Sequence, residues 1–420
     1  MAAVPHLLLV CPRSDVLGKL LGLPVALTVV HRPGGDRALE ESLAARVVDA
    51  DFQSPDALLA VARDVHAWRP VDAVLGLTEL SLYPVAVVAD ALGARGNRAT
   101  TVACAQDKAA MRRVLHERGV GTTAHRVCAT EREAAEFART CPAGMVLKPV
   151  EGNGGTGVHV VRHPQELAAA WAWTTGAKAA WAWSKEDARG AAPARVLAEE
   201  LLTGREFSVE TLTVDGRHQV LAVTRKHTTG PPHFVETGHD LPAALPEPQQ
   251  AALVTAALGA LDAIGYAWGP CHTEVMLAED GERATVIEIN VRQGGDQIWE
   301  LVQHVTGIDM IYGAVAALAH AAPPPPAVAL AGGAAIRYLT PAPGRVTAVE
   351  GLAEALAVEG VIRAGELPSP GDEVAPLGDS WNRAGHVIAT GPDPKSAAAA
   401  AEAAAARIVI RTERPPEARR

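Results

Sequence analysis

The residues Met145–Gly157, with the sequence MVLKPVEGNGGTG, predict a strand that runs into a glycine-rich loop. Lys148 closes the apolar strand, and residues 151–157 contain four glycines. Residues 158–162 predict a second strand, so the loop belongs to a hairpin, whereas a P-loop joins a strand to a helix. Glycine permits the positive φ angles and the close approach that wrapping a triphosphate requires, and Lys148 can reach phosphate oxygens. A flexible hairpin turn is the alternative interpretation of this loop alone.

A second informative stretch is residues 199–209, EELLTGREFSV, where one strand ends and another begins. Glu199 and Glu206 flank an apolar hinge in this stretch. Adenine needs an apolar slot with backbone donors and acceptors at its edge, and a ribose needs a carboxylate for its hydroxyl groups. The stretch therefore predicts a nucleotide site, with solvated acids around a hairpin as the alternative.

A third group combines Glu274 with the row Glu288, Asn290 and Arg292. The three residues of the row alternate along a strand, so their side chains share one face, and the apolar residues between them cover the other. Oxygen ligands from adjacent strands suit Mg²⁺, which takes one or two carboxylates together with phosphate oxygens. The row predicts a metal site, and a surface salt bridge is the alternative.

Composition narrows the functional class. The chain has 420 residues and a formal net charge of −10, which suits two or three domains and argues against a nucleic-acid binder. No window of 18 apolar, uncharged residues exists, so no membrane span is predicted, and residues 6–11 predict a buried strand rather than a signal peptide. Five scattered cysteines without CxxC spacing favour a reducing, cytoplasmic location.

The order of apolar patterns predicts an α/β (α+β) fold. The first 95 or so residues alternate strands with helices, which indicates a parallel sheet. The predicted strands there are residues 6–11, 25–30 and 73–77, and the predicted helices are 55–68 and 81–92. Further on, helices are predicted at 107–118, 249–264 and 396–407, strands at 195–201, 206–214 and 217–223, and a hairpin at 272–278 and 284–290. Four prolines at 323–326 predict a surface linker.

Taken in order, these segments resemble the ATP-grasp superfamily, with similarity from about Asp107 to Leu301. The resemblance implies an N-terminal Rossmann-like pre-ATP-grasp domain (1–97), an ATP-grasp domain (98–325) with a lid subdomain at about 120–202, a C-terminal ligase subdomain (326–412) and a tail (413–420). It implies the cofactors ATP and Mg²⁺, or Mn²⁺, with Glu274, Glu288 and Asn290 as metal ligands. The nucleotide-binding residues that it implies are Lys108, Lys148, Gly154, Gly155, Thr156, Gly157, Glu199, Glu200, Leu202 and Glu206.

Within the superfamily the chain resembles the L-amino acid ligases, which make dipeptides. Residues 234–239 are similar to their E-x-x-H substrate segment, residues 290–295 to their N-x-R-x-x-G, and residues 334–338 to the start of their C-terminal region. The resemblance implies a catalytic set and a substrate set. The catalytic set is Arg292, Glu236, His239 and Gly295, and the substrate set is Glu236, His239, Arg292, Gly294 and Asp296. Lys226 and His227 are further candidates for phosphate binding, and Arg337 for a place near the active site.

Asp296 departs from the family pattern, because some of these ligases place a bulky tryptophan four residues beyond the arginine. Two interpretations of Asp296 stay open. A carboxylate there can meet a substrate ammonium group, or it can cap the helix predicted at 297–305.

The function that follows from the resemblance is that of an ATP-dependent carboxylate–amine ligase. Such an enzyme forms a C–N bond between two amino acids, or an amino acid and an amine, through an acyl phosphate, and releases ADP and phosphate. The alternatives are an ATP-dependent carboxylase of a small molecule and a non-catalytic ATP-binding module. The expected partners are amino acid substrates and a second copy of the chain in a homodimer, with neither nucleic acid nor membrane.

Overall fold

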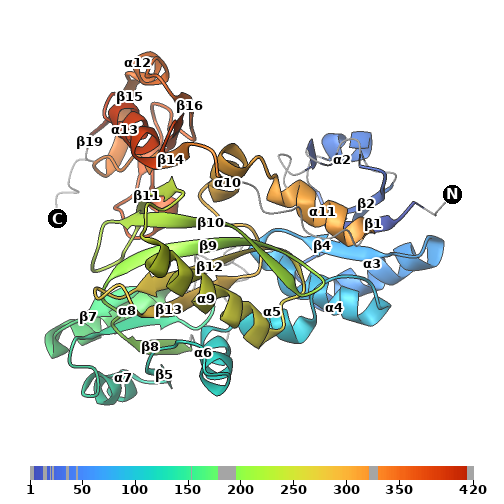
Figure 1. Cartoon of the computed structure of the whole chain (residues 1–420), viewed down its shortest axis with the longest axis horizontal. Coiled ribbons are helices and arrows are strands. Elements are labelled where there is room, and N and C mark those ends of the chain that lie inside the picture. Colours follow the sequence, from blue (N-terminus) through green and yellow to red (C-terminus); the bar gives the residue numbers. More distant parts are fainter. Residues whose placement is uncertain are drawn as a thin grey trace, which may run out of the picture.

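The computed structural model describes residues 4–12, 17–18, 20, 23–34, 37–43, 46–152, 154–177, 195–320 and 330–413. Asn153 of the glycine loop, the predicted proline linker and the predicted tail beyond residue 413 lie outside these ranges. The described strands form four sheets, which Figure 1 shows with helices packed against them.

The N-terminal region is a parallel sheet in the order β3-β2-β1-β4, which confirms the predicted strand–helix alternation. Its elements are β1 (His6–Val10), β2 (Ala26–His31), α2 (Ala38–Leu43), β3 (Arg46–Asp49), α3 (Pro55–Trp68), β4 (Ala73–Gly76), η1 (Glu79–Ser81) and α4 (Leu82–Leu92). Ser54 begins α3 by accepting a hydrogen bond from the Ala57 amide, and Pro55 follows at the first helical position. The strand β1 is buried throughout, as its unbroken apolar run predicts for a parallel sheet with covered faces.

The next sheet carries the glycine loop and has the order β5-β8-β6-β7. We call it the lid. It is built from β5 (His125–Cys128), α7 (Glu131–Ala138), β6 (Met145–Pro149), β7 (His159–Val161), η2 (Pro164–Glu166), α8 (Leu167–Gly176) and β8 (Val196–Glu200). The strands β6 and β7 pair antiparallel, so the predicted strand–loop–strand hairpin is confirmed. After β8 the chain leaves the lid through the hinge at Leu201 and Leu202.

The central sheet has eight antiparallel strands in the order β13-β12-β9-β10-β11-β14-β18-β16. The first five come from the middle of the chain: β9 (Arg205–Val214), β10 (Arg217–Thr228), β11 (Glu236–Leu241), β12 (Trp268–Leu277) and β13 (Ala284–Asn290). The other three are C-terminal: β14 (Gly333–Tyr338), β16 (Val361–Gly365) and β18 (His386–Gly391). Pairing of β11 with β14 therefore carries one sheet across the boundary predicted near residue 326.

Helices cover both faces of the central sheet. One face packs on α5 (Ala99–Gln106), α6 (Lys108–Glu117) and α9 (Glu247–Ile264), and the other packs on α10 (Ile298–Thr306) and α11 (Met310–His320). The C-terminal region adds α12 (Leu352–Leu356), η5 (Ser380–Asn382), α13 (Pro394–Ala405) and a small sheet of β17 (Glu373–Val374), β15 (Gly344–Glu350) and β19 (Val409–Glu413). Figure 1 shows the lid in teal below the central strands and the C-terminal elements in orange and red above them.

No single helix in the described ranges is long and apolar enough to cross a membrane. The helices α10 and α11 meet the length and composition criteria only when taken together, and they are bent by 85° at the break between them.

Candidate active site

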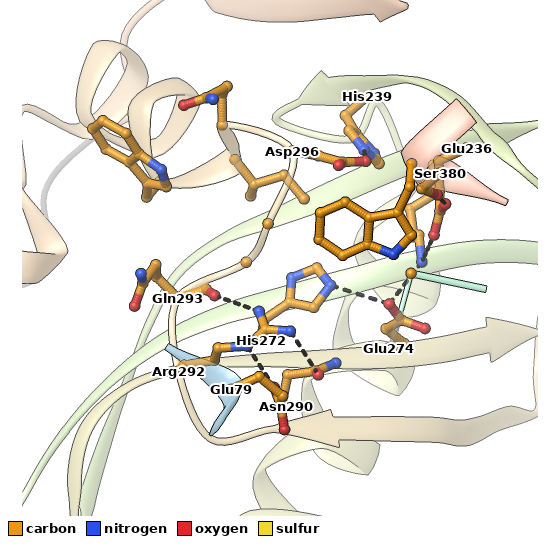
Figure 2. A pocket seen from close by; sticks show the side chains of 18 of the residues that line it. Glu79, Glu236, His239, His272, Glu274, Asn290, Arg292, Gln293, Asp296 and Ser380 are labelled. Carbon is orange, nitrogen blue, oxygen red and sulfur yellow. Dashed lines mark hydrogen bonds and ion pairs between the residues drawn. The ribbon is translucent and has the colours of Figure 1, made fainter. Parts of the chain in front are cut away.

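A cavity of about 590 Å³ lies where the N-terminal region, the glycine loop, the central sheet and the C-terminal region meet. The charged or polar side chains that line it come from all four parts. They are Thr78, Glu79, Thr156, Lys226, Glu236, His239, His272, Glu274, Glu288, Asn290, Arg292, Gln293, Asp296, Gln297, Trp299, Tyr338, Glu366, Ser380, Trp381 and Arg383. Figure 2 shows His272, Glu274, Asn290 and Arg292 grouped together, with Glu236, His239, Asp296 and Ser380 nearby.

The predicted row on β13 faces this cavity. Glu288, Asn290 and Arg292 all line it, and the intervening Ile289 and Val291 are buried in the hydrophobic core beneath α9. Glu274 on β12 is the direct cross-strand partner of Glu288, so the two carboxylates belong to neighbouring strands on the cavity side. The two-residue period of the strand thus places an acid, an amide and a guanidinium in one row.

Two buried ammonium groups accompany these acids. Lys226 Nζ lies 2.8 Å from Glu274 Oε1 and 3.5 Å from Glu236 Oε1, and it also pairs with Glu206. Burial would lower the pKa of Lys226, but the three carboxylates raise it far above its usual value. Lys108 Nζ lies 2.9 Å from Glu288 Oε1 and donates to the Gly152 carbonyl at 2.6 Å. Lys226 therefore remains charged beside the acids.

His272 lies between Glu210 and Glu274 and contacts both carboxylates. Its Nδ1 lies 3.0 Å from Glu210, which is fully buried, and its Nε2 lies 3.3 Å from Glu274 Oε1. Burial disfavours the charged imidazole, but Glu210 and Glu274 together raise the pKa of His272 to about 9. Burial would raise the pKa of Glu274, and Lys226 and His272 lower it instead. Sequence reasoning assigned no role to His272 or Glu210.

Arg292 is held by a residue from the N-terminal region. Its Nε donates to Glu79 Oε2 at 2.7 Å, and its Nη1 donates to the Gln293 carbonyl at 2.9 Å (Figure 2). Gln106 donates to the other oxygen of Glu79 at 2.9 Å. Sequence reasoning missed Glu79, although it begins η1 shortly after the end of β4. Because ligand sites of open parallel sheets lie at the carboxyl ends of their strands, that position was a usable signal.

The predicted nucleotide residues divide into two places. Gly154 and Thr156 line the cavity, and Gly154, Gly155 and Gly157 have φ angles of 64°, 72° and 77°, which only glycine adopts without strain. Lys148 and Glu199 lie outside the cavity lining, in a buried cluster of charged side chains next to the hinge of the lid. Glu200 and Leu202 are half-buried beside them at the hinge.

In that cluster Glu199 accepts from Arg112 Nε at 2.6 Å and pairs with Lys148 Nζ at 2.6 Å. Arg112 also donates to the carbonyls of Val286 and Ile287 on β13. Burial would raise the pKa of Glu199, but the two cations lower it to about 2. Sequence reasoning missed Arg112, yet the spacing of Lys108, Met111, Arg112 and Leu115 puts both cations on the apolar face of one helix.

Asp296 does not cap α10, so that interpretation was wrong. The backbone φ angles are 55° at Asp296 and 59° at Gln297, and Gln297 is the N-cap, without a side-chain cap bond. The Asp296 carboxylate instead accepts two bonds from Arg383, at 2.6 and 2.8 Å, and lies 2.9 Å from His239 Nε2. Burial would raise the pKa of Asp296, and these two partners lower it. Arg383 stacks over Tyr338 at 3.6 Å.

The remaining substrate candidates are partly brought together. Glu236, His239, Gly294 and Gly295 line the cavity. Two weaker candidates do not: His227 Nε2 lies 2.6 Å from Asp240, and Arg337 Nη1 lies 2.7 Å from the same carboxylate. Their neighbours Lys226 and Tyr338 line the cavity instead, because successive side chains of a strand point to opposite faces.

Three models of protein families match the chain. They are an ATP-grasp N-terminal domain at residues 19–94, an ATP-grasp domain at 141–300 and the L-amino acid ligase C-terminal domain 2 at 337–413. The crystal structure of an L-amino acid ligase from Bacillus licheniformis superimposes with a TM-score of 0.79 at 23% identity, and the match covers 98% of this chain and all of that one. The chain therefore carries ATP-grasp domains, followed by a segment that matches the C-terminal domain 2 of L-amino acid ligases.

Two curated relatives are informative. An uncharacterized protein, y4rH, of Sinorhizobium fredii (strain NBRC 101917 / NGR234) is 30% identical over 69% of this chain and 58% of its own length. The alanine–anticapsin ligase of Bacillus subtilis is 25% identical over 68% of this chain and 66% of its own length. The chain thus spans about three-fifths to two-thirds of the length of these relatives.

ATP-grasp enzymes use ATP and Mg²⁺, and another structural neighbour is a biotin carboxylase domain in complex with MgADP. The donor set at the cavity fits a magnesium ion, since Glu274, Glu288 and Asn290 offer hard oxygen ligands on adjacent strands. Within the described ranges no three His, Cys, Asp or Glu side chains cluster as a metal site. The glycines and the buried lysines beside them fit a polyphosphate.

Proposed function

We propose that this chain is an ATP-dependent carboxylate–amine ligase that joins two amino acids, or an amino acid and an amine. The observation that carries the proposal is that one cavity contains two different chemical groups of residues. One group suits a metal-bound triphosphate: it consists of the oxygen ligands of Glu274, Glu288 and Asn290 and the buried ammonium group of Lys226. Glu236 and His239 line the same cavity beside them and suit a small substrate with an ammonium group.

Glu274, Glu288 and Asn290 would hold Mg²⁺, and bound MgATP would supply the γ-phosphoryl group that turns a carboxylate into an acyl phosphate. The chain itself then has to position groups and neutralise charge. Lys226 and Lys108 lie beside the acids and provide positive charge at that point. Because each lysine is paired with these acids, its ammonium group is held in place before any ligand arrives.

Arg292 is suited to the acyl group. Its guanidinium is held by Glu79, Asn290 and the Gln293 carbonyl, and Arg292 follows the proposed metal ligands Glu288 and Asn290 in the same row. A planar guanidinium held in this way can stabilise the oxyanion that forms when an amine attacks the acyl phosphate. The loop Gly294–Gly295 lines the cavity just beyond it and leaves room for the reacting group.

His239 and Glu236 are suited to the amine. The Nε2 of His239 is bound to Asp296, while its buried Nδ1 has no hydrogen-bond partner among the described residues. A buried ring nitrogen without a partner is a position where a ligand or a water completes the hydrogen bonding. Glu236 is held by Lys226 and by the Ser380 hydroxyl, which keeps its carboxylate at the cavity. These two residues would bind the ammonium group and accept its proton.

The test is an ATPase screen with single amino acids and with pairs, with the nucleotide products and any condensation product identified by mass spectrometry. We expect ADP and phosphate in a one-to-one ratio with a new amide. Stoichiometric AMP and pyrophosphate would refute the acyl-phosphate route. ATP turnover that depends on bicarbonate and yields a carboxylated product would establish the carboxylase alternative instead.

A further inference from the structure

Residues 379–383 of the C-terminal region border the cavity on the substrate side. We call them the C-terminal strap. Ser380, Trp381 and Arg383 of the strap all line the cavity, and Asp379 begins η5 by accepting a hydrogen bond from the Trp381 amide at 3.0 Å. The strap is therefore a short, internally bonded turn that contributes three side chains to a site made mainly by other parts of the chain.

Arg383 connects the strap to the substrate side of the cavity through hydrogen bonds. It donates two hydrogen bonds to Asp296, one to the Ser380 carbonyl at 2.7 Å and one to the Glu236 carbonyl at 3.2 Å. Four of the five guanidinium N–H groups are thus used within the protein. The Ser380 hydroxyl adds a bond to the Glu236 carboxylate. Because Asp296 is occupied by Arg383 and His239, its carboxylate has a structural partner on both oxygens.

The strap also touches the lid. The Ser380 amide donates to the Gly154 carbonyl at 3.1 Å, and a Cβ placed on Gly154 would lie 2.8 Å from Trp381 Nε1. Just before the strap, a Cβ on Gly378 would lie 2.8 Å from the ring of Trp173 on α8. The glycine loop and the substrate side of the cavity are therefore both in contact with the same five residues.

Space for a substrate remains in the cavity that Trp381 lines. A Cβ placed on Gly295 would meet nothing within 4 Å, and the neighbouring Asp296 side chain is drawn towards Arg383. Trp381 itself is 70% exposed although it lines the cavity, so most of its indole is free to pack against a ligand. An exposed indole offers a large, flat apolar surface against which an apolar group of a ligand can pack.

We propose that Trp381 is a specificity-determining residue, whose indole limits the size of the substrate side chain and shields the acyl phosphate from water. This inference rests on the proposed ligase function and adds the substrate class to it. Because the exposed indole offers mainly apolar surface to the cavity, the substrate side chain that packs on it is apolar. Asp296 and Arg383 are positioning residues, which act on the substrate through the strap.

The first experiment compares Trp381→Ala and Trp381→Phe with the wild type. A matched control is Trp68→Ala, because Trp68 is also exposed (55%) but lies on α3 outside the cavity lining. We measure kcat/KM with alanine and with phenylalanine as the variable substrate, and the phosphate released per amide bond formed. Trp381→Ala should raise the phenylalanine-to-alanine ratio about tenfold, as expected for enlarging an apolar pocket. It should also release more phosphate per amide, with an unchanged melting temperature.

Trp381→Phe retains an aromatic wall and should stay near the wild type. If Trp381→Ala has the same phenylalanine-to-alanine ratio of kcat/KM and the same phosphate released per amide bond as Trp68→Ala, Trp381 does not limit the substrate side chain. Calorimetric titration of alanine and phenylalanine into the enzyme with MgADP measures the same size preference without turnover. A chain that forms no amide with any pair would therefore refute the ligase function, while the titration still decides the role of Trp381.

The second experiment tests how Asp296 acts. If it acts only through Arg383, the shift in size preference in Asp296→Asn/Arg383→Gln should equal that of either single variant, because residues of one network are not additive. Additive shifts would show that Asp296 also acts by a route other than Arg383, through His239 or by direct contact with the substrate, and would overturn its assignment as a residue that acts through the strap.

Discussion

Replacing Arg112 by methionine should destabilise the protein by about 3–5 kcal/mol, the range for removing one partner of a buried ion pair. Arg112 is fully buried, and Glu199 is 4% exposed. Methionine fills much of the same volume, so the loss is mainly that of ion pairing and of the hydrogen bonds to two β13 carbonyls. The lowered pKa of Glu199 has the same sign. Its change from 4.5 to about 2 corresponds to about 3 kcal/mol, which Arg112 shares with Lys148 and which therefore sets no separate value for Arg112.

The measurement is equilibrium unfolding in guanidinium chloride and thermal unfolding, both followed by circular dichroism. The matched control is Arg113→Met, since Arg113 is the next residue of the same helix and is exposed. If the lid and central sheet unfold as one unit, about 3 kcal/mol lowers the melting temperature by about 6–12 °C. Equal midpoints for the Arg112 and Arg113 variants would refute the reasoning, because the cluster would then contribute no net stability.

Three further predictions concern charged groups of the same site. Folding lowers the pKa of Glu199, so this residue adds to the free energy of unfolding above pH 4.5, and the added stability is lost as the pH falls towards 2. The free energy of unfolding of Glu199→Gln should therefore change less between pH 4.5 and 2 than the free energy of unfolding of the wild type. Glu288→Ala should lower kcat by at least about 10²–10³, whereas Glu282→Ala, on the exposed β12–β13 turn, should leave it unchanged; near-normal turnover of the Glu288 variant would contradict its role as a metal ligand. Arg292→Lys should not sustain ligation, because a compact ammonium group lacks the planar fork that places one donor on Glu79 and another on the Gln293 carbonyl; wild-type kcat/KM in this variant would show that Arg292 acts as a diffuse charge.

Local periodicity was sufficient to predict the core of the site. Alternation along one strand predicted that Glu288, Asn290 and Arg292 share a face, and all three line the cavity. The glycine spacing predicted the β6–β7 hairpin for the same reason, because both signals depend on residues that are near in sequence. The roles of these residues in binding metal, nucleotide and substrate stay predictions.

Contacts between distant segments were not predictable in this way. Glu79 and Arg292 are 213 residues apart, and Asp296 and Arg383 are 87 apart, so no local period relates them. Asp296 also shows how a tertiary contact can override a local rule. Its position before a helix favoured a cap, but a cap requires an extended backbone, and the positive φ of Asp296 directs the carboxylate to Arg383.

The pairing of β11 with β14 has a consequence for dissecting the molecule. Gly238 to Leu241 form their ladder with Ala334 to Arg337, and the C-terminal strands continue outward from there. A fragment that stops before Gly333 would leave the amide and carbonyl groups of β11 that face β14 without partners along an open sheet edge, which invites edge-to-edge association with other molecules. The C-terminal region is consequently best studied by point substitution, since excising it would change the colloidal behaviour of the remainder together with its chemistry.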